Sequence, residues 1–168
     1  MQDNYICKIA SLDEVMFMFD FYIEHDVEDR ENWTKWKEGA RDNYLNKRTI
    51  NYIGVLNGKT ICEATAIINT ECNPEVVDLV DDKTAYLEAF RTLPEYRNQG
   101  YFSKLYRFMI EDLKSRGYER ATIGVEPKET RNKAIYNHYG FTEHVKDATE
   151  KYPDGTTIDV EYYSMKLK

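Results

Sequence analysis

The sequence predicts a single mixed α/β domain, with an antiparallel meander early in the chain and a strand–helix–strand unit later. The Asn57–Gly58 pair separates two apolar runs, and both residues tolerate positive φ, so it predicts a hairpin. After residue 84, apolar strand-like runs alternate with amphipathic helical stretches. The length of 168 residues suits one core, and the chain shows neither internal repeat nor linker.

The first seventy residues predict a strand, two helices and the hairpin. Ser11 and Glu14 have the spacing of a capping box, and apolar residues follow at helical intervals. A second helix carries Trp33, Trp36, Ala40 and Tyr44 on one face. We expect strands at 5–10, 50–56 and 60–68, and helices from 11 to about 23 and at 30–45.

The second half begins with the acidic segment 69–83, which predicts a loop; its stretch 71–82 is either a lid or disordered. Phe102, Leu105, Met109 and Leu113 then mark one face of a helix, and Gly117 follows as its C′ residue. We expect strands at 84–93 and 121–125, a helix that Gly100 opens and Gly117 follows, a second helix at 130–139, and a hairpin around 153–155 within 141–168.

Composition narrows the function classes. The net charge is −7 and the pI is near 5.1, which argues against a general nucleic-acid surface. Three cysteines and three histidines show no metal-ligand spacing, so we expect no metal, and Cys7 and Cys62 read as buried free thiols. No signal peptide and no apolar run of about 20 residues is evident. The expectation is a soluble, cytoplasmic protein.

The turn Arg97–Gly100 lies between a predicted strand and a predicted helix. The first amides of a helix have no partner within it, and the helix dipole makes this end positive. Arg97 adds a fixed charge that can pair with phosphate oxygens. The turn therefore predicts an anion site.

Two ordered stretches resemble the GCN5-related N-acetyltransferase (GNAT) superfamily, over roughly residues 50–168 and loosely before that. The first runs from Leu93 to Leu105 and reads LPEYRNQGYFSKL; the second is the helix end Tyr136–Phe141, YNHYGF. The resemblance implies one domain over 1–168, with a twisted, mixed, mostly antiparallel sheet that splays after its fourth strand between flanking helices. It also implies acetyl-CoA as the acyl-donor cosubstrate.

The resemblance implies that the pantetheine arm of acetyl-CoA pairs with backbone beside a bulge in the fourth strand. It places the pyrophosphate on the turn and on the first amides of the next helix. Phe102 departs from the family's Gly or Ala, and Glu129 from its frequent Asn. The implied cofactor residues are Phe90, Arg91, Thr92, Arg97, Asn98, Gln99, Gly100, Tyr101, Phe102, Ser103, Glu129 and Asn132.

Acetyl transfer to an amine needs a base for the ammonium and an acid for the departing thiolate. Tyr136 matches the family's general-acid position, and a phenol suits that role. Glu88, on the strand leading to the bulge, is a candidate base, equally interpretable as a solvent-facing strand residue. Glu63 is a weaker candidate and His138 reads as a surface residue; a chain of waters is the other route for the proton.

In this family the acceptor contacts usually come from the first two helices. Here they carry acidic and aromatic residues, which suit an amine cation by Coulomb attraction and cation–π contact. The alternative reading is an ordinary solvated connection between helices. The candidate acceptor-binding residues are Tyr22, His25, Asp26, Glu28 and Trp33.

The leading hypothesis is an acetyl-CoA-dependent N-acetyltransferase that acts on a primary amine of a small molecule or peptide by direct attack in a ternary complex. The alternative is a catalytically inactive acyl-CoA-binding or regulatory module, which the departures at Phe102 and Glu129 keep open. No phosphate-binding loop of the nucleotide-hydrolase type is present. The C-terminal hairpin is a candidate surface for a homodimer.

Overall fold

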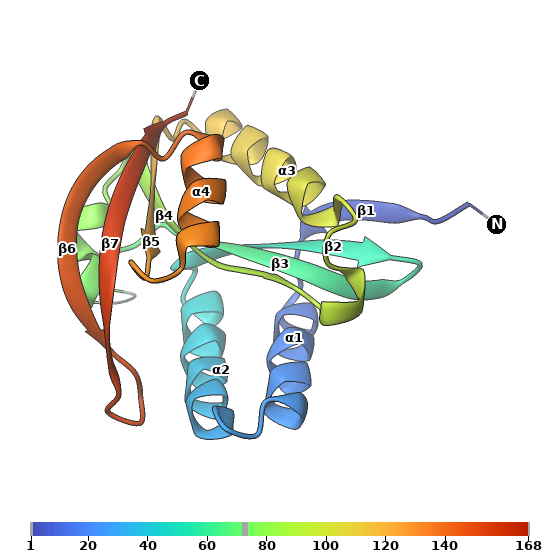
Figure 1. The fold of residues 1–168 in the computed structure, drawn as a ribbon. Helices are drawn as coiled ribbons and strands as arrows, with labels where there is room; N and C mark the ends of the chain where they lie inside the picture. The colour runs from blue at the N-terminus through green and yellow to red at the C-terminus, as the bar shows by residue number, and fades with distance from the viewer. Residues whose placement is uncertain (1, 72–73, 168) are drawn as a thin grey trace.

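The computed structural model describes residues 2–71 and 74–167, and its strands form one seven-stranded sheet (Figure 1). The strand order is β1-β2-β3-β4-β5-β7-β6. Neighbouring strands are antiparallel except β4 and β5, which are parallel. The predicted mixed, mostly antiparallel α/β sheet is therefore confirmed.

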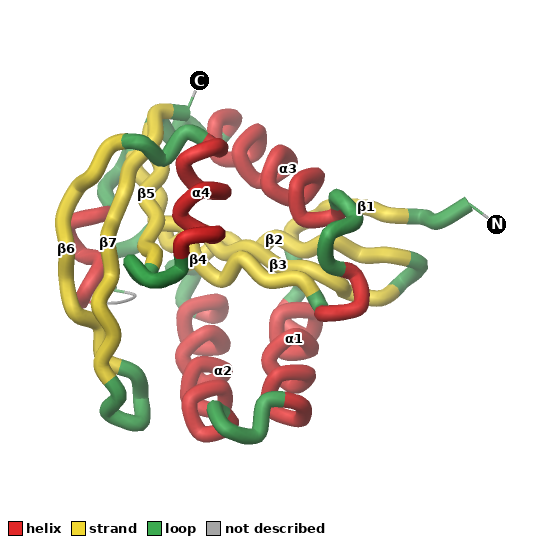
Figure 2. Tube along the Cα trace, viewed as in Figure 1, coloured by secondary structure: helices red, strands yellow, loops and turns green. Residues whose placement is uncertain are grey.

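Helices cover both faces of this sheet (Figure 2). The α1–α2 pair lies on one face, while α3 and α4 lie on the other. In chain order the elements are β1 (Tyr5–Ile9), α1 (Leu12–His25), α2 (Arg30–Leu45), β2 (Thr49–Leu56), β3 (Lys59–Ile67), the 3-10 helix η1 (Pro74–Leu79), β4 (Thr84–Thr92), the 3-10 helix η2 (Pro94–Tyr96), α3 (Tyr101–Ser115), β5 (Arg120–Val125), α4 (Thr130–Tyr139), β6 (Glu143–Lys151) and β7 (Thr157–Lys166).

The capping box at the start of α1 forms as expected. The Ser11 amide donates to Glu14 Oε1 at 2.9 Å, and the Glu14 amide donates to Ser11 Oγ at 3.3 Å. Val15, Met16 and Phe19 of this helix are buried against β2 and the apolar face of α2. The apolar spacing of both helices thus predicted the face that covers the sheet.

The acidic segment is partly ordered, which corrects the expectation of a loop that is a lid or disordered. Residues 74–79 form η1, in which Val76 and Leu79 are buried. The Leu79 carbonyl accepts a hydrogen bond from Thr122 Oγ1 at 2.9 Å, and Asp78 pairs with Lys146 of β6 at 2.7 Å. Apolar residues at 76, 79 and 80 were the signal for this packing, because a lid need not bury them.

The described residues contain two free cysteines, and they include neither a candidate metal site nor a helix that could span a membrane. Cys7 is half-buried and Cys62 is buried, both as free thiols, and Cys72 lies outside the described residues. Within 2–71 and 74–167, no group of three or more His, Cys, Asp or Glu residues could hold a metal ion. None of the helices in these ranges is long and apolar enough to cross a membrane.

Gly54 lets the N-terminal strand approach the hairpin and α3. A Cβ at this position would lie 2.1 Å from Tyr5 Oη and 2.6 Å from Cys62 Sγ. The Tyr5 hydroxyl occupies this space because it donates to the carbonyl of Tyr101, at 2.8 Å, in the first turn of α3. Gly54 therefore helps to hold the beginning of α3 against the sheet.

We expect Gly54→Ala to lower the free energy of unfolding by about 1–3 kcal/mol, because the added methyl group overpacks a filled site. Chemical denaturation measures the change. Gly39→Ala is the matched control: a Cβ there meets nothing within 4 Å, and alanine in a helix interior is expected to gain about 0.5–1 kcal/mol over glycine. Equal effects of the two substitutions would contradict the close approach at Gly54.

Candidate functional site

The sheet splays open between β4 and β5. The two strands pair only from Thr84 with Arg120 to Leu87 with Ile123. Two residues later, Ala89 has a φ of 57°, a left-handed conformation that is costly for a residue with a side chain. Beyond it β4 continues to pair with β3 alone in the described register. Its backbone from Phe90 to Thr92 therefore offers an edge on the β5 side, where an extended ligand can add.

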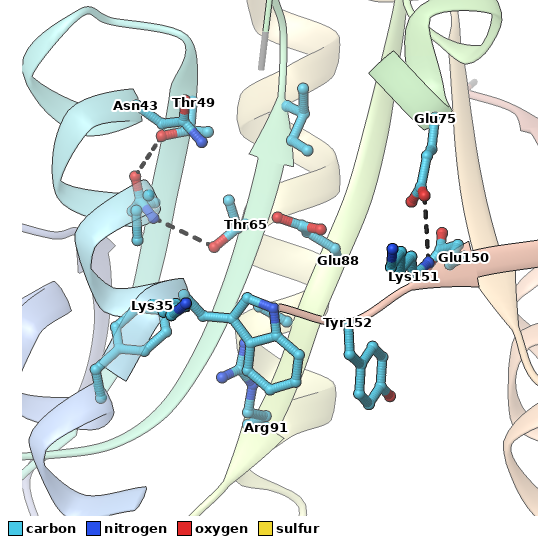
Figure 3. Close-up of a pocket in the computed structure, with 17 residues that line it drawn as sticks. Lys35, Asn43, Thr49, Thr65, Glu75, Glu88, Arg91, Glu150, Lys151 and Tyr152 are labelled. Carbon is cyan, nitrogen blue, oxygen red and sulfur yellow. Dashed lines mark hydrogen bonds between the residues drawn. The ribbon is translucent and has the colours of Figure 1, made fainter. Parts of the chain in front are cut away.

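Two adjoining cavities of about 390 Å³ each lie along this splay. Figure 3 shows the first of them. Asn51, Thr65 and Glu88 line the first, and the second extends past the end of β5 to Glu126 and Glu129. The two cavities share enough lining to form one cleft. The shared residues are Trp36, Ala89, Arg91, Glu150 and Tyr152.

Glu88 is the carboxylate at the centre of the first cavity. Its side chain is exposed to solvent in the cleft, and the cavity walls displace part of the water around its carboxylate. The resulting loss of hydration raises the pKa of Glu88 to about 7; the charge of Arg91 opposes this rise, while those of Glu150 and Glu63 add to it. A carboxyl with this pKa exchanges protons near neutral pH.

Arg91 covers the aromatic residues of the first two helices. Its guanidinium carbon lies 4.7 Å from the ring centroid of Trp33, 5.5 Å from that of Phe19 and 5.8 Å from that of Tyr22. Its Nη1 lies 3.9 Å from Oε2 of the buried Glu63. Burial raises the pKa of Glu63, and the charge of Arg91 opposes that rise. A cation of the chain itself therefore occupies the aromatic surface.

The structure brings together three of the five residues expected to bind the acceptor. Trp33 lines the second cavity and stacks on Tyr22, with ring centroids 4.5 Å apart, and its Nε1 donates to Asp26 Oδ2 at 2.9 Å. His25 is exposed and its Nδ1 lies 2.7 Å from the Phe21 carbonyl oxygen. Of these five residues only Trp33 lines a cavity: Tyr22 and Asp26 reach the cleft through their contacts with Trp33, and His25 and Glu28 make no such contact.

Trp36, Glu150 and Tyr152 line both cavities, although the sequence did not indicate them as site residues. Trp36 belongs to α2, whereas Glu150 and Tyr152 come from the end of β6, more than 100 residues later. The rings of Trp36 and Tyr152 meet edge to face at 5.0 Å. Only the tertiary fold joins these segments; the sequence carried no signal for it beyond the turn that follows Tyr152.

The predicted anion site is a left-handed turn ahead of α3. Asn98 has a φ of 62° and Gly100 a φ of 84°, and in the described chain no side chain caps the helix. Arg97 Nε donates to the Thr92 carbonyl at 3.0 Å, Gln99 Nε2 to that of Glu95 at 3.0 Å, and Arg131 Nη2 to Asn98 Oδ1 at 3.0 Å. These contacts fix the turn and place two arginines beside uncapped amides.

The side chains after Gly100 are directed toward the protein. The Phe102 ring packs on Phe90, with centroids 5.0 Å apart, and the Tyr101 ring packs on Tyr5 at 4.8 Å. Ser103 hydrogen-bonds with the Tyr139 phenol, which opposes the rise that burial causes in the Tyr139 pKa. The larger side chain at Phe102 is therefore held by packing against β4, and its backbone stays in the first turn of α3.

Tyr136 lies on α4, half-buried next to the edge of β4, with its ring 5.9 Å from that of Phe90. Burial raises the pKa of Tyr136 to about 12, and the charge of Glu129 adds to the rise. Asn132 Nδ2 donates to Glu129 Oε2 at 3.2 Å, and Glu129 lines the second cavity. His138, on the same helix, is exposed.

The sequence model described as Acetyltransferase (GNAT) family matches residues 11–141. An acetyltransferase of GNAT family from Streptococcus pneumoniae is 16% identical, with a TM-score of 0.69 over 98% of this chain and 100% of that one. The ribosomal-protein-S18-alanine N-acetyltransferase from Escherichia coli is 17% identical, with a TM-score of 0.65 over 98% and 95%. A GNAT family acetyltransferase from Elizabethkingia anophelis with acetyl-CoA bound is 18% identical, with a TM-score of 0.57 over 75% and 80%.

At these identities the structural similarities show the fold alone. No curated protein matches the sequence significantly.

Replacing Glu88 by glutamine tests its raised pKa without any ligand. Protonated Glu88 favours the folded state, and this contribution is lost as the pH rises through the folded-state value of about 7. We expect Glu88→Gln to match the wild-type melting temperature below pH 4.5, the ordinary pKa of the group, and to exceed it above about pH 7, by calorimetry. Glu28→Gln, at an exposed position outside both cavities, is the control. A difference that is constant with pH would contradict the raised pKa.

Proposed function

Since the chain belongs to the GNAT family of acetyltransferases, we propose that it transfers the acetyl group of acetyl-CoA to a primary amine of a small molecule or peptide. The amine attacks the thioester directly while both substrates are bound. One observation carries the proposal: a single cleft runs along the splay, β4 leads into the uncapped turn ahead of α3, and Glu88 and Tyr136 lie next to the free edge of β4.

The turn ahead of α3 suits the pyrophosphate of CoA. Its uncapped amides and the positive helix end attract an anion, and Arg97 and Arg131 add charge although the whole chain carries −7. We assign Gln99, Gly100 and the following three residues to this contact through their amides. The edge of β4 at 90–92 would hold the pantetheine arm as an added strand.

Acetyl-CoA supplies an acyl thioester, and the chain's own groups manage the protons. Glu88 is the proposed base, because a carboxyl with a pKa of about 7 accepts a proton near neutral pH, where an ammonium must lose one to become nucleophilic. A water between the ammonium and Glu88 is compatible with this role. Glu63 is less suitable, since Arg91 lies against it and it lines neither cavity.

Tyr136 is the proposed general acid. With its pKa at about 12, the phenol stays protonated at neutral pH and can donate to sulfur as negative charge develops there. Its position beside Phe90 puts the hydroxyl-bearing ring next to the edge where the pantetheine arm would lie. Glu129 and Asn132, already hydrogen-bonded to each other, are assigned to the wall of the same channel.

The cleft favours a cationic acceptor. Carboxylates in its lining outnumber cations, and Arg91 is already engaged with Glu63 and three aromatic rings. Trp36 and Tyr152, rather than the Tyr22–Trp33 stack, present the aromatic surface shared by both cavities. The carboxylates are those of Asp29, Glu75, Glu88, Glu126, Glu129 and Glu150, and the cations are Lys35, Arg91 and Lys151.

Binding of CoA is expected to raise the melting temperature. At about 100 times its Kd, a ligand bound only to the folded state stabilises it by about 2.7 kcal/mol, or roughly 5–10 °C for a chain of this size. Differential scanning fluorimetry measures the shift for CoA and for pantetheine, which lacks the pyrophosphate and should give a smaller one. Arg97→Ala is expected to reduce the CoA shift, whereas Arg41→Ala, at an exposed site on α2, preserves it. No shift with saturating CoA would refute the proposed site.

Thiol release from acetyl-CoA, tested with spermidine, kanamycin, lysine and an alanine-terminated peptide, distinguishes an enzyme from a module that only binds acyl-CoA. With the best of these amines, we expect Tyr136→Phe to lower kcat by about 100-fold and to leave the KM for acetyl-CoA unchanged. Tyr118→Phe, at a half-buried tyrosine following α3, is the control. Full turnover by Tyr136→Phe would remove this phenol from the mechanism, and no release with any amine would favour the binding module.

A further inference from the structure

A row of three polar side chains crosses the sheet at the floor of the first cavity. Asn51 of β2 is paired in register with Thr65 of β3, and Thr65 is paired with Glu88 of β4. All three line the cavity, and Asn51 and Thr65 are each only 7% exposed. Polar groups buried in a core destabilise it unless they are hydrogen-bonded, so this row needs a physical explanation.

The hydrogen bonds along the row have a direction. Thr49 Oγ1 donates to Asn51 Oδ1 at 2.9 Å, and Asn51 Nδ2 donates to Thr65 Oγ1 at 3.2 Å (Figure 3). The Thr65 oxygen thus accepts a hydrogen bond, and its own O–H proton is available for donation. The chain of donors therefore runs from Thr49 toward β4.

Glu88 is the carboxylate paired in register with Thr65, and the structure has no direct hydrogen bond between these two side chains. Paired residues on neighbouring strands have Cβ atoms about 4.5–5.5 Å apart, close enough for their side chains to interact. Figure 3 shows the Glu88 carboxylate directed toward Thr65 across the cavity floor. A single water between a hydroxyl donor and a carboxylate acceptor would have the polar partners that an ordered water needs.

We propose that Thr65 is a positioning residue for the base: its hydroxyl, oriented by Asn51 and Thr49, donates a hydrogen bond to the Glu88 carboxylate through one water. Donation to the charged form stabilises that form and fixes its orientation in the cleft. Its importance for catalysis rests on the proposed function of Glu88, whereas the hydrogen bond itself can be measured in the protein alone.

The water-mediated form gives a balanced route for the proton. The acceptor ammonium passes a proton to the water oxygen while the water passes one of its own protons to Glu88. One N–H bond and one water O–H bond break, and one water O–H bond and one Glu88 O–H bond form. Thr65 keeps its proton throughout and holds the water by donating to it.

Other groups also act on Glu88, and a substitution at Thr65 leaves them in place. The charges of Arg91, Glu150 and Glu63 affect its titration, and burial affects it most. A shift in the Glu88 pKa after removal of the Thr65 hydroxyl therefore measures the effect of that hydroxyl on Glu88. The charged or titratable groups around Glu88 are Glu63 of β3, Tyr86 and Arg91 of β4, Lys35 of α2, Glu75 of η1, Glu150 and Lys151 of β6, and Tyr152.

The direct test is the titration of the Glu88 carboxyl carbon by ¹³C NMR in the full-length protein. Loss of one hydrogen bond to a carboxylate is expected to move the midpoint upward by about half a unit to one unit in Thr65→Val. Thr65→Ser keeps the hydroxyl and is expected to restore the wild-type midpoint. Thr60→Val is the matched control, because Thr60 lies on the same strand, is also 7% exposed and does not line the cavity.

An unchanged Glu88 midpoint in Thr65→Val, or an equal rise in Thr60→Val, would overturn the proposal. If Thr65→Val does not fold, Thr65→Ala replaces it in the test, and the same rise in the Glu88 midpoint is expected. In the thiol-release assay, Thr65→Val is expected to shift the acid limb of kcat against pH by the same amount as the NMR midpoint. Full activity of Glu88→Gln would refute the proposed base, and the NMR shift would still decide whether Thr65 donates to Glu88.

Discussion

The end of pairing between β4 and β5 after Leu87 is the constraint on which the rest of the molecule depends. Up to that residue the parallel pair closes the core; beyond it, the left-handed Ala89 turns β4 away and leaves one edge without a strand. The cleft, its carboxylate and the aromatic side chains at its mouth all lie along this divergence. The strained conformation of Ala89 persists because the pairing of β4 with β3 before and after this residue holds the backbone in place.

The protein separates two opposite electrostatic environments within one acidic chain. At the beginning of α3, uncapped amides and two arginines produce a local positive field, while carboxylates dominate the cleft on the other side of β4. Arg91, which lines the cleft, lies 3.9 Å from the buried Glu63 and opposes its charge. Under the proposed function, the pyrophosphate of acetyl-CoA would bind in the first environment and a cationic amine in the second.

Periodicity and caps predicted most of the fold, because they depend on neighbours in sequence. The capping box of α1, the Asn57–Gly58 hairpin and the helix after Gly100 all formed where local chemistry placed them. The prediction failed at η1, where the acidic residues suggested a loop or lid but Val76 and Leu79 found the core. For the site, the sequence singled out Glu88, Tyr136 and the turn, and missed Trp36, Glu150 and Tyr152.

The sequence by itself determined the family, the element order and the turn ahead of α3, since each depends on contiguous residues whose backbone chemistry is local. Only the tertiary structure decided which side chains share the cleft. It placed Arg91 over the aromatic rings expected to receive an acceptor, brought the end of β6 against α2, and aligned Asn51, Thr65 and Glu88 across three strands. Strand register and the burial of charge depend on contacts between distant segments, so no local pattern encodes them.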